Sequence, residues 1–160
     1  MDLPPPLQQH RWLAQWLGEW TFEAVAKGPP GRPDERCGGR EHVRPLGDLW
    51  VVCEGRGAMP GGGEAATLMT VGFDPARGRF VGTWCGSMMT HLWIYDGALD
   101  PDGRILTLAA RGPSFTGEGM AEYRDAIEVV SGDERVLTSS VQDADGTWQP
   151  FMTARYRRER

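Results

Sequence analysis

The stretch WLAQWLGEWTFEAVA, at residues 12–26, changes its hydrophobic period at Gly18 and thereby decides the fold. Before the glycine, apolar residues within 7–17 recur with the spacing of one helix face, which predicts an amphipathic helix. Gly18 is expected to end that helix, because glycine readily adopts the backbone conformation that follows a helix C-terminus. From Trp20 onward the apolar residues alternate with polar ones, as in a half-buried β-strand.

Nine further segments follow with the same period of two, and short turns separate them. Turns such as Asp100-Pro101-Asp102-Gly103 join antiparallel neighbours, whereas 29–33 and 59–63 are expected to be longer loops. Closing such a series into a barrel removes its exposed strand edges. The sequence therefore predicts an all-β fold, an antiparallel meander barrel of about ten strands with the N-terminal helix over one opening. The nine segments are 36–45, 48–58, 65–74, 78–85, 90–99, 104–111, 119–130, 134–142 and 147–157.

Length and charge restrict the class of protein. The 160 residues fit one domain, with 1–18 as helical lead-in and lid and 19–157 as barrel. A net charge of −5 argues against a nucleic-acid partner, since such proteins usually carry a basic face. The three cysteines form no CxxC pair, and the N-terminus lacks the pattern of a signal peptide, so we expect a cytoplasmic protein. No apolar run approaches the roughly 18 residues of a membrane span.

No segment carries a specific catalytic or metal-binding motif. The three histidines form neither HxxxH nor HExxH, so no metal site is expected. The run from Gly112 to Gly117 is one residue too long for a GxSxG nucleophile elbow. We therefore predict no catalytic residue and no cofactor.

The segment 90–99 is the most informative for binding, because His91, Trp93 and Tyr95 share one face of the predicted strand. If Leu92 and Ile94 pack outside, this aromatic face lines the barrel, and in the opposite register it faces solvent. Apolar walls with a few polar groups are typical of a small-molecule pocket. The candidate ligand-binding residues are Trp20, Trp84, His91, Trp93, Tyr95 and Arg124.

Two patterns resemble known barrels. Gly18-Glu19-Trp20 after a helix resembles the Gly-x-Trp that begins lipocalins, which implies that Trp20 closes the barrel under an Arg of the last strand, here Arg155 or Arg157. The whole chain resembles the bacterial family called domain of unknown function 1579, grouped with the calycins. Besides the first motif, this resemblance rests on the segments 70–74, 79–84 and 152–157. It implies a barrel and supplies no catalytic residues.

The chain departs from two better-known relatives of these barrels. Fatty-acid-binding proteins hold a carboxylate with Arg-x-Tyr on the last strand, whereas here Arg155 and Tyr156 are adjacent and point to opposite faces. Nitrobindin-type barrels bind haem through a histidine near the last strand, and this chain has no histidine after His91. Neither ligand is therefore expected to be bound in the manner of those relatives.

We expect the barrel to bind a small, largely apolar or amphipathic molecule without catalysis. One alternative is an isomerase, cyclase or hydrolase on the same scaffold with His91 as acid–base group, because imidazole titrates near neutral pH. Another is a barrel with a solid core that acts as an interaction module, marked by an apolar outer patch. A homodimer is compatible with all three.

Overall fold

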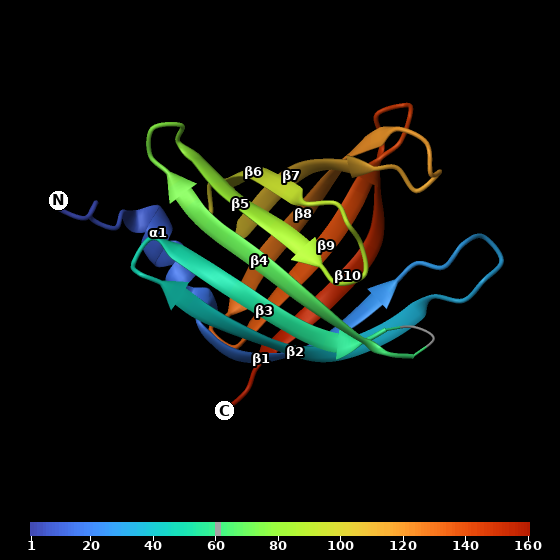
Figure 1. Ribbon diagram of the computed structural model, residues 1–160, viewed down its shortest axis with the longest axis horizontal. Helices are drawn as coiled ribbons and strands as arrows, with labels where there is room; N and C mark the ends of the chain where they lie inside the picture. Colours follow the sequence, from blue (N-terminus) through green and yellow to red (C-terminus); the bar gives the residue numbers. More distant parts are fainter. Residues whose placement is uncertain (60–61) are drawn as a thin grey trace.

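The computed structural model describes residues 1–59 and 62–160, and within them ten strands form a closed antiparallel barrel (Figure 1). The all-β meander expected from the sequence is confirmed, since each strand pairs with the next and β1 also pairs with β10. Two residues of the expected loop 59–63, Pro60 and Gly61, lie outside the described part. The strands are β1 Gly18–Ala26, β2 Glu35–Leu46, β3 Trp50–Ala58, β4 Glu64–Asp74, β5 Arg79–Gly86, β6 Trp93–Leu99, β7 Ile105–Pro113, β8 Met120–Ser131, β9 Glu134–Gln142 and β10 Trp148–Arg158.

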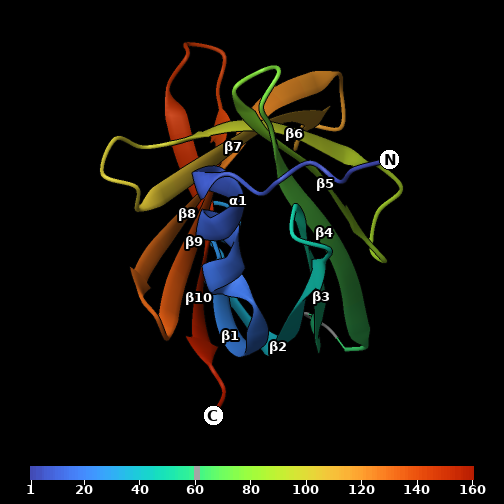
Figure 2. The same cartoon turned by 90° about the vertical axis from the view of Figure 1, so that its left-hand side faces the viewer.

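The N-terminal helix covers one opening of this barrel (Figure 2). It is shorter than the expected 7–17: α1 runs from Gln8 to Leu13 and continues as a 3-10 turn, η1, from Ala14 to Trp16. Gly18 then turns the chain into β1 at a φ of 127°, a backbone conformation that side chains with a Cβ rarely adopt. A Cβ there would also lie 2.6 Å from Nη1 of Arg158, so a larger residue would in addition have to displace the end of that side chain.

Polar contacts fix the helix to three separate parts of the barrel. His10 is buried between the backbone N–H of Leu7, which donates to its Nδ1 at 2.9 Å, and the carbonyl of Phe73, 3.0 Å from its Nε2. This arrangement fits the ring tautomer in which Nδ1 accepts and Nε2 donates. Trp12 donates to the carbonyl of Gly103 at 2.7 Å, in the turn between β6 and β7. The lid is therefore attached at β4, at that turn and, as described next, at β10.

Arg158 joins the end of the chain to the lid. It donates to the carbonyls of Leu17 (2.5 Å) and Gln15 (2.9 Å), and its guanidinium lies 4.3 Å from the ring centroid of Trp20. The expectation that Arg155 or Arg157 fills this place is wrong. The register pairs Trp20 with Arg158, which puts both on the inner face, whereas the other two arginines are exposed on the outside.

The lidded end of the barrel is the well-packed end. Leu13, Trp16 and Trp20 are almost wholly buried there, at 1%, 2% and 2% exposure, beside inward side chains such as Leu106. Buried and exposed residues alternate along β7, as a two-sided strand requires. The opposite end carries, among others, the connections β1–β2, β5–β6, β7–β8 and β9–β10, and no helix of the described residues lies over it (Figure 1). We call that end the mouth.

Candidate functional site

The barrel interior is not completely filled beyond the packed lid. Met69, Leu137 and Tyr156 face inward from β4, β9 and β10, and yet each is only half-buried. Because the lid end is sealed by buried tryptophans, solvent reaches these side chains from the mouth. A cavity of about 30 Å³ lies at the inner end of this space. It is lined by Trp16, Glu41, Cys53, Met69, Ile127, Arg135, Leu137 and Tyr156.

A buried ion pair crosses the inner end. Arg135 on β9 donates through Nη2 to Oε1 of Glu41 on β2, and their side chains are 6% and 11% exposed. Charged side chains are almost never so deeply buried unless they are paired. The pair connects two strands that are not neighbours in the sheet. It also places charged groups where a purely apolar core would have aliphatic side chains.

Arg135 is also held between aromatic rings. Its guanidinium carbon lies 4.1 Å from the ring centroid of Tyr156, 4.6 Å from that of Trp20 and 5.7 Å from that of Trp16. Such cation–π contacts strengthen when the cation is desolvated. Burial lowers the pKa of Arg135 to about 10, so the side chain stays charged at neutral pH.

A second polar group occupies the middle of the interior. Asp125 accepts hydrogen bonds from the hydroxyl of Tyr95 at 2.5 Å and from that of Ser139 at 2.6 Å. Burial raises the pKa of Asp125, and the two hydrogen bonds oppose this effect. Burial, with the nearby Asp125, also raises the pKa of Tyr95 well above 10, so this phenol remains protonated.

Aromatic side chains line one side of the mouth. Trp93 lies edge-on to both His91 and Tyr123, with ring centroids 4.8 and 4.9 Å apart. Phe115 contacts Tyr123 at 5.8 Å and Phe151 at 5.0 Å, and it is 69% exposed. We call these five residues the aromatic rim. They offer apolar surface at the solvent-facing opening of the barrel.

The structure distributes the six residues expected from the sequence over different depths. Trp20 lies in the lid end, Tyr95 in the middle of the interior, and Trp84 and Trp93 nearer the mouth, half-buried. Four of the six therefore face the interior. The other two, His91 and Arg124, lie elsewhere.

His91 precedes β6, which begins at Trp93 and not at residue 90 as expected. Its Nε2 lies 3.0 Å from the carbonyl of Arg111, at the rim. Arg124 lies on the outer face of β8, with its guanidinium 4.2 Å from the ring centroid of Trp148. The strand alternation explains this position, because Tyr123 and Asp125 on either side face inward.

The sequence reasoning missed Glu41, Arg135 and Asp125, the charged groups of the interior. A signal for them exists: each stands in line with apolar residues of its own strand, as Asp125 does between Tyr123 and Ile127. A charge on an otherwise apolar face is uncommon and marks either a pairing or a binding role. Which residues pair with these charged side chains depends on how the sheet closes into a barrel. The sequence of a single strand does not show this.

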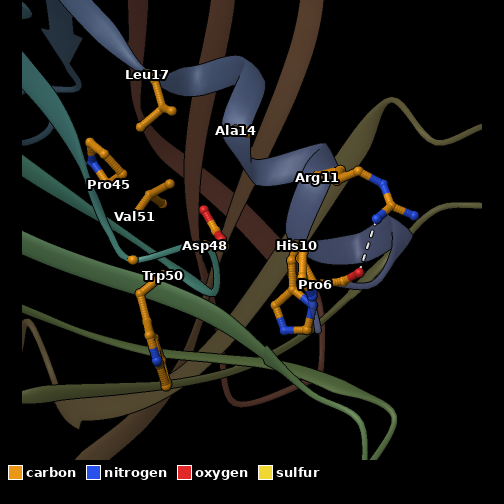
Figure 3. A pocket seen from close by; sticks show the side chains of 10 residues that line it. Pro6, His10, Arg11, Ala14, Leu17, Pro45, Asp48, Trp50 and Val51 are labelled. Atoms are coloured by element: carbon orange, nitrogen blue, oxygen red, sulfur yellow. Dashed lines mark hydrogen bonds between the residues drawn. The ribbon is translucent and has the colours of Figure 1, made fainter. Parts of the chain in front are cut away.

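A second hollow lies outside the barrel, between α1 and the turn from β2 to β3 (Figure 3). Its volume is about 300 Å³, and Pro6, His10, Asp48 and Trp50 are among its lining residues. The polar groups contributed by the helix are already used: both ring nitrogens of His10 are bonded, and Arg11 donates to the carbonyl of Pro6 at 2.9 Å. We therefore place the candidate site in the interior.

Two further observations concern metal binding and the crossing of a membrane. Over residues 1–59 and 62–160, no group of three or more His, Cys, Asp or Glu side chains is arranged to hold a metal ion. In the same part of the chain, no helix combines the length and apolar character that crossing a bilayer requires.

Comparisons with known proteins agree on the fold. The profile of a family described as "Protein of unknown function (DUF1579)" matches residues 5–158. Rv2717c from M. tuberculosis has a similar solved structure, with 14% identity, a TM-score of 0.63, and coverage of 98% of this chain and 100% of that one. No curated protein matches.

Two designed barrels are also similar in structure. EF1p2_mFAP2b, solved bound to DFHBI, has 10% identity and a TM-score of 0.52 over 95% of this chain and 100% of its own. A fluorescence-activating β-barrel designed de novo has 13% identity and a TM-score of 0.50 over 91% of this chain and 95% of its own. At these identities the likeness concerns the fold alone.

Proposed function

The chain belongs to the DUF1579 family, whose function is unknown, and from its interior we propose that it binds a small, largely apolar molecule inside the barrel. The observation that carries the proposal is the partial exposure of Met69, Leu137 and Tyr156, three inward side chains of a closed barrel. A solid core would bury them. The space they border is open to solvent at the mouth and closed by the lid.

The chemistry of this space supports a ligand that is mainly apolar. Its walls are aliphatic and aromatic, with Met69, Ile127 and Leu137 at the inner cavity. Polar groups are few and lie deep, at the Glu41–Arg135 pair and around Asp125. Apolar walls with a small number of fixed polar groups are the usual composition of a small-molecule site. One structure of similar fold was solved bound to DFHBI and another is described as a fluorescence-activating β-barrel, and both are compatible with this use.

The proposal gives His91 no acid–base role. Its ring is engaged with the carbonyl of Arg111 at the rim, away from the carboxylate of the interior. The outer face does carry exposed apolar residues, among them Leu68 and Ile94 on β4 and β6. An interaction module with a solid core is the weaker alternative, because the interior side chains are partly exposed.

The test fills the interior by enlarging one inward side chain. We expect Leu137→Trp to abolish binding of the apolar dye Nile red, because the larger side chain occupies the space beside the inner cavity. Thr138→Trp, which places the same side chain on the outer face of the same strand, should bind as the wild type does. Circular dichroism establishes that both variants keep the barrel, and Met69→Trp replaces the first variant if it fails to fold. Equal dye affinity in the filled and unfilled barrels would refute interior binding.

Native mass spectrometry of gently purified protein provides an independent test. A small molecule retained at close to one per chain, and lost in Leu137→Trp, is the expected result. A retained molecule that survives this substitution would place the binding site elsewhere.

A further inference from the structure

Two buried N–H groups at the inner cavity have no protein partner among the described residues. They are Nη1 of Arg135 and Nε1 of Trp16, and both side chains line the cavity. Most buried donors in proteins are hydrogen-bonded to protein or to ordered water. The two groups therefore mark a place where an acceptor from outside the chain is expected.

Other contacts hold the Arg135 guanidinium and fix the position of Nη1. Nη2 bonds Glu41, and the guanidinium plane is packed against Tyr156 and Trp20. A planar guanidinium held by several contacts loses little further freedom when it forms one more hydrogen bond. The donor is thus organised before any ligand arrives.

We infer that the inner cavity binds the carbonyl oxygen of an uncharged ligand through Nη1 of Arg135 and Nε1 of Trp16. The inference rests on the proposed function and specifies the ligand. The cavity of about 30 Å³ admits only the tip of a molecule, since roughly 10–15 Å³ corresponds to one water. The apolar remainder lies against Met69, Ile127 and Leu137, toward the mouth. In the free protein, water takes the place of the oxygen.

The charges around the cavity favour an uncharged acceptor over a carboxylate. The positive charge of Arg135 is already matched by Glu41, and that of Arg158 by Asp133, 3.6 Å away, and by backbone carbonyls. A ligand carboxylate would bring a second negative charge beside Glu41 and would lose its hydration. A carbonyl oxygen accepts hydrogen bonds and offers none, which complements two unpartnered donors.

The first experiment compares two probes of equal chain length, 2-octanone and octanoate, by isothermal titration calorimetry at pH 7. We expect the ketone to bind at least tenfold more tightly than the carboxylate. Octanoate binding as tightly as 2-octanone, or more tightly, would overturn the choice of an uncharged carbonyl.

The second experiment removes one donor. Trp16→Phe keeps an aromatic ring and deletes the N–H, and we expect roughly fivefold weaker binding of 2-octanone, the usual effect of one hydrogen bond. The matched control is Trp12→Phe on the same helix, whose N–H bonds Gly103 and whose ligand affinity should stay within twofold. Unchanged ketone affinity in Trp16→Phe would overturn the role of this donor.

A measurement on the unaltered protein keeps the inference testable if Trp16→Phe does not fold. In 1H–15N spectra, the indole N–H resonance of Trp16 should shift when 2-octanone is added, and that of Trp12 should not. A Trp16 resonance that stays in place at saturating ketone contradicts the inference, although binding in the barrel would stand. If neither Nile red, 2-octanone nor octanoate binds the wild type, the proposed function fails, and the inference fails with it.

Discussion

Glu41 and Arg135 form an ion pair across the closed end of the barrel, although β1 and β10 separate their strands in the sheet. The contact therefore connects two strands that are not hydrogen-bonded neighbours, through the interior. Both side chains are largely removed from water, and the loss of hydration offsets much of their attraction. Each buried charge is therefore stabilised only while its partner is present.

Removing one member should destabilise the fold strongly. We expect Glu41→Leu or Arg135→Met to cost about 3–5 kcal/mol of the free energy of unfolding, because each leaves a buried charge without its partner. The double variant should recover most of this loss. Urea denaturation of the four proteins in a double-mutant cycle measures the coupling. The exposed pair Arg44–Glu54 is the control, with an expected coupling of about 1 kcal/mol or less. Equal coupling energies at the two pairs would contradict this account.

Asp125 should make the protein less stable as pH rises. Burial raises the pKa of its carboxyl above 3.8, so from that pH upward the folded protein retains a proton that the unfolded chain releases. The stability that the protonated Asp125 provides below pH 3.8 is therefore lost as the pH rises through the pKa of this carboxyl in the folded protein. We expect Asp125→Asn to gain stability relative to the wild type between about pH 3.5 and pH 7, measured by urea denaturation at each pH.

Asp100 supplies the control of opposite sign for that experiment. Hydrogen bonds from the backbone N–H groups of Ile105 and Arg104 lower the pKa of its carboxyl, so its ionised form stabilises the folded state above pH 3.8. That stability is lost as pH falls through the lowered pKa. Asp100→Asn should consequently lose stability relative to the wild type as pH rises from about 3 to 7. The same trend in both variants would show that the two carboxyls do not differ as described.

Arg158 should hold the lid in place. We expect Arg158→Ala to cost about 1–3 kcal/mol of stability, since it removes charged hydrogen bonds to Gln15 and Leu17. Hydrogen exchange of the amides in α1 should increase more than exchange in β7. Arg157→Ala, an exposed neighbour, should change stability by less than about 0.5 kcal/mol. Protection of α1 that survives Arg158→Ala would exclude this role.

Gly112 should be intolerant of a methyl group. A Cβ there would lie 2.2 Å from the ring of Trp93, so Gly112→Ala must displace a member of the aromatic rim. We expect a loss of about 1–3 kcal/mol, typical of overpacking. The control is Gly132→Ala, where a Cβ meets no atom within 4 Å. Thermal denaturation compares them, and equal melting temperatures would contradict the proposed overlap.

The strands and their order follow from the sequence because the period of two, the Asp-Gly turns and the glycine after the helix are local signals. The strand from 134 to 142 was predicted with both of its ends, and most other ends lie within two residues. The start of β6 at Trp93 is the exception. His91 has the alternation of a strand residue but no ladder partner, since β6 begins to pair with β5 only at Trp93.

The binding residues were predictable only in part. Trp93 and Tyr95 face inward, as one of the two registers requires. The alternation of residues alone, however, does not show which face of a strand points into the barrel. Asp125 is a charged residue, and yet its side chain lies on the inner face of β8. Arg124 therefore lies on the outer face, because successive side chains of a strand alternate between the two faces. The choice of Arg158 over Arg155 or Arg157 depends on how β1 pairs with β10, a contact between residues 138 positions apart at Trp20 and Arg158.

That pairing also sets the order in which the molecule can assemble. Hairpins from β1 to β10 connect neighbours in the chain and can form as soon as both strands exist, but the seam between Gly18–Ala26 and Trp148–Arg158 joins the two ends. Closing so long a loop is entropically costly and slows folding. On a ribosome the first strand must wait for the last, and its exposed edge remains a potential aggregation site until then. A circular permutant that links β10 to β1 through a short loop should move this late pairing to the two strands between which the chain is cut.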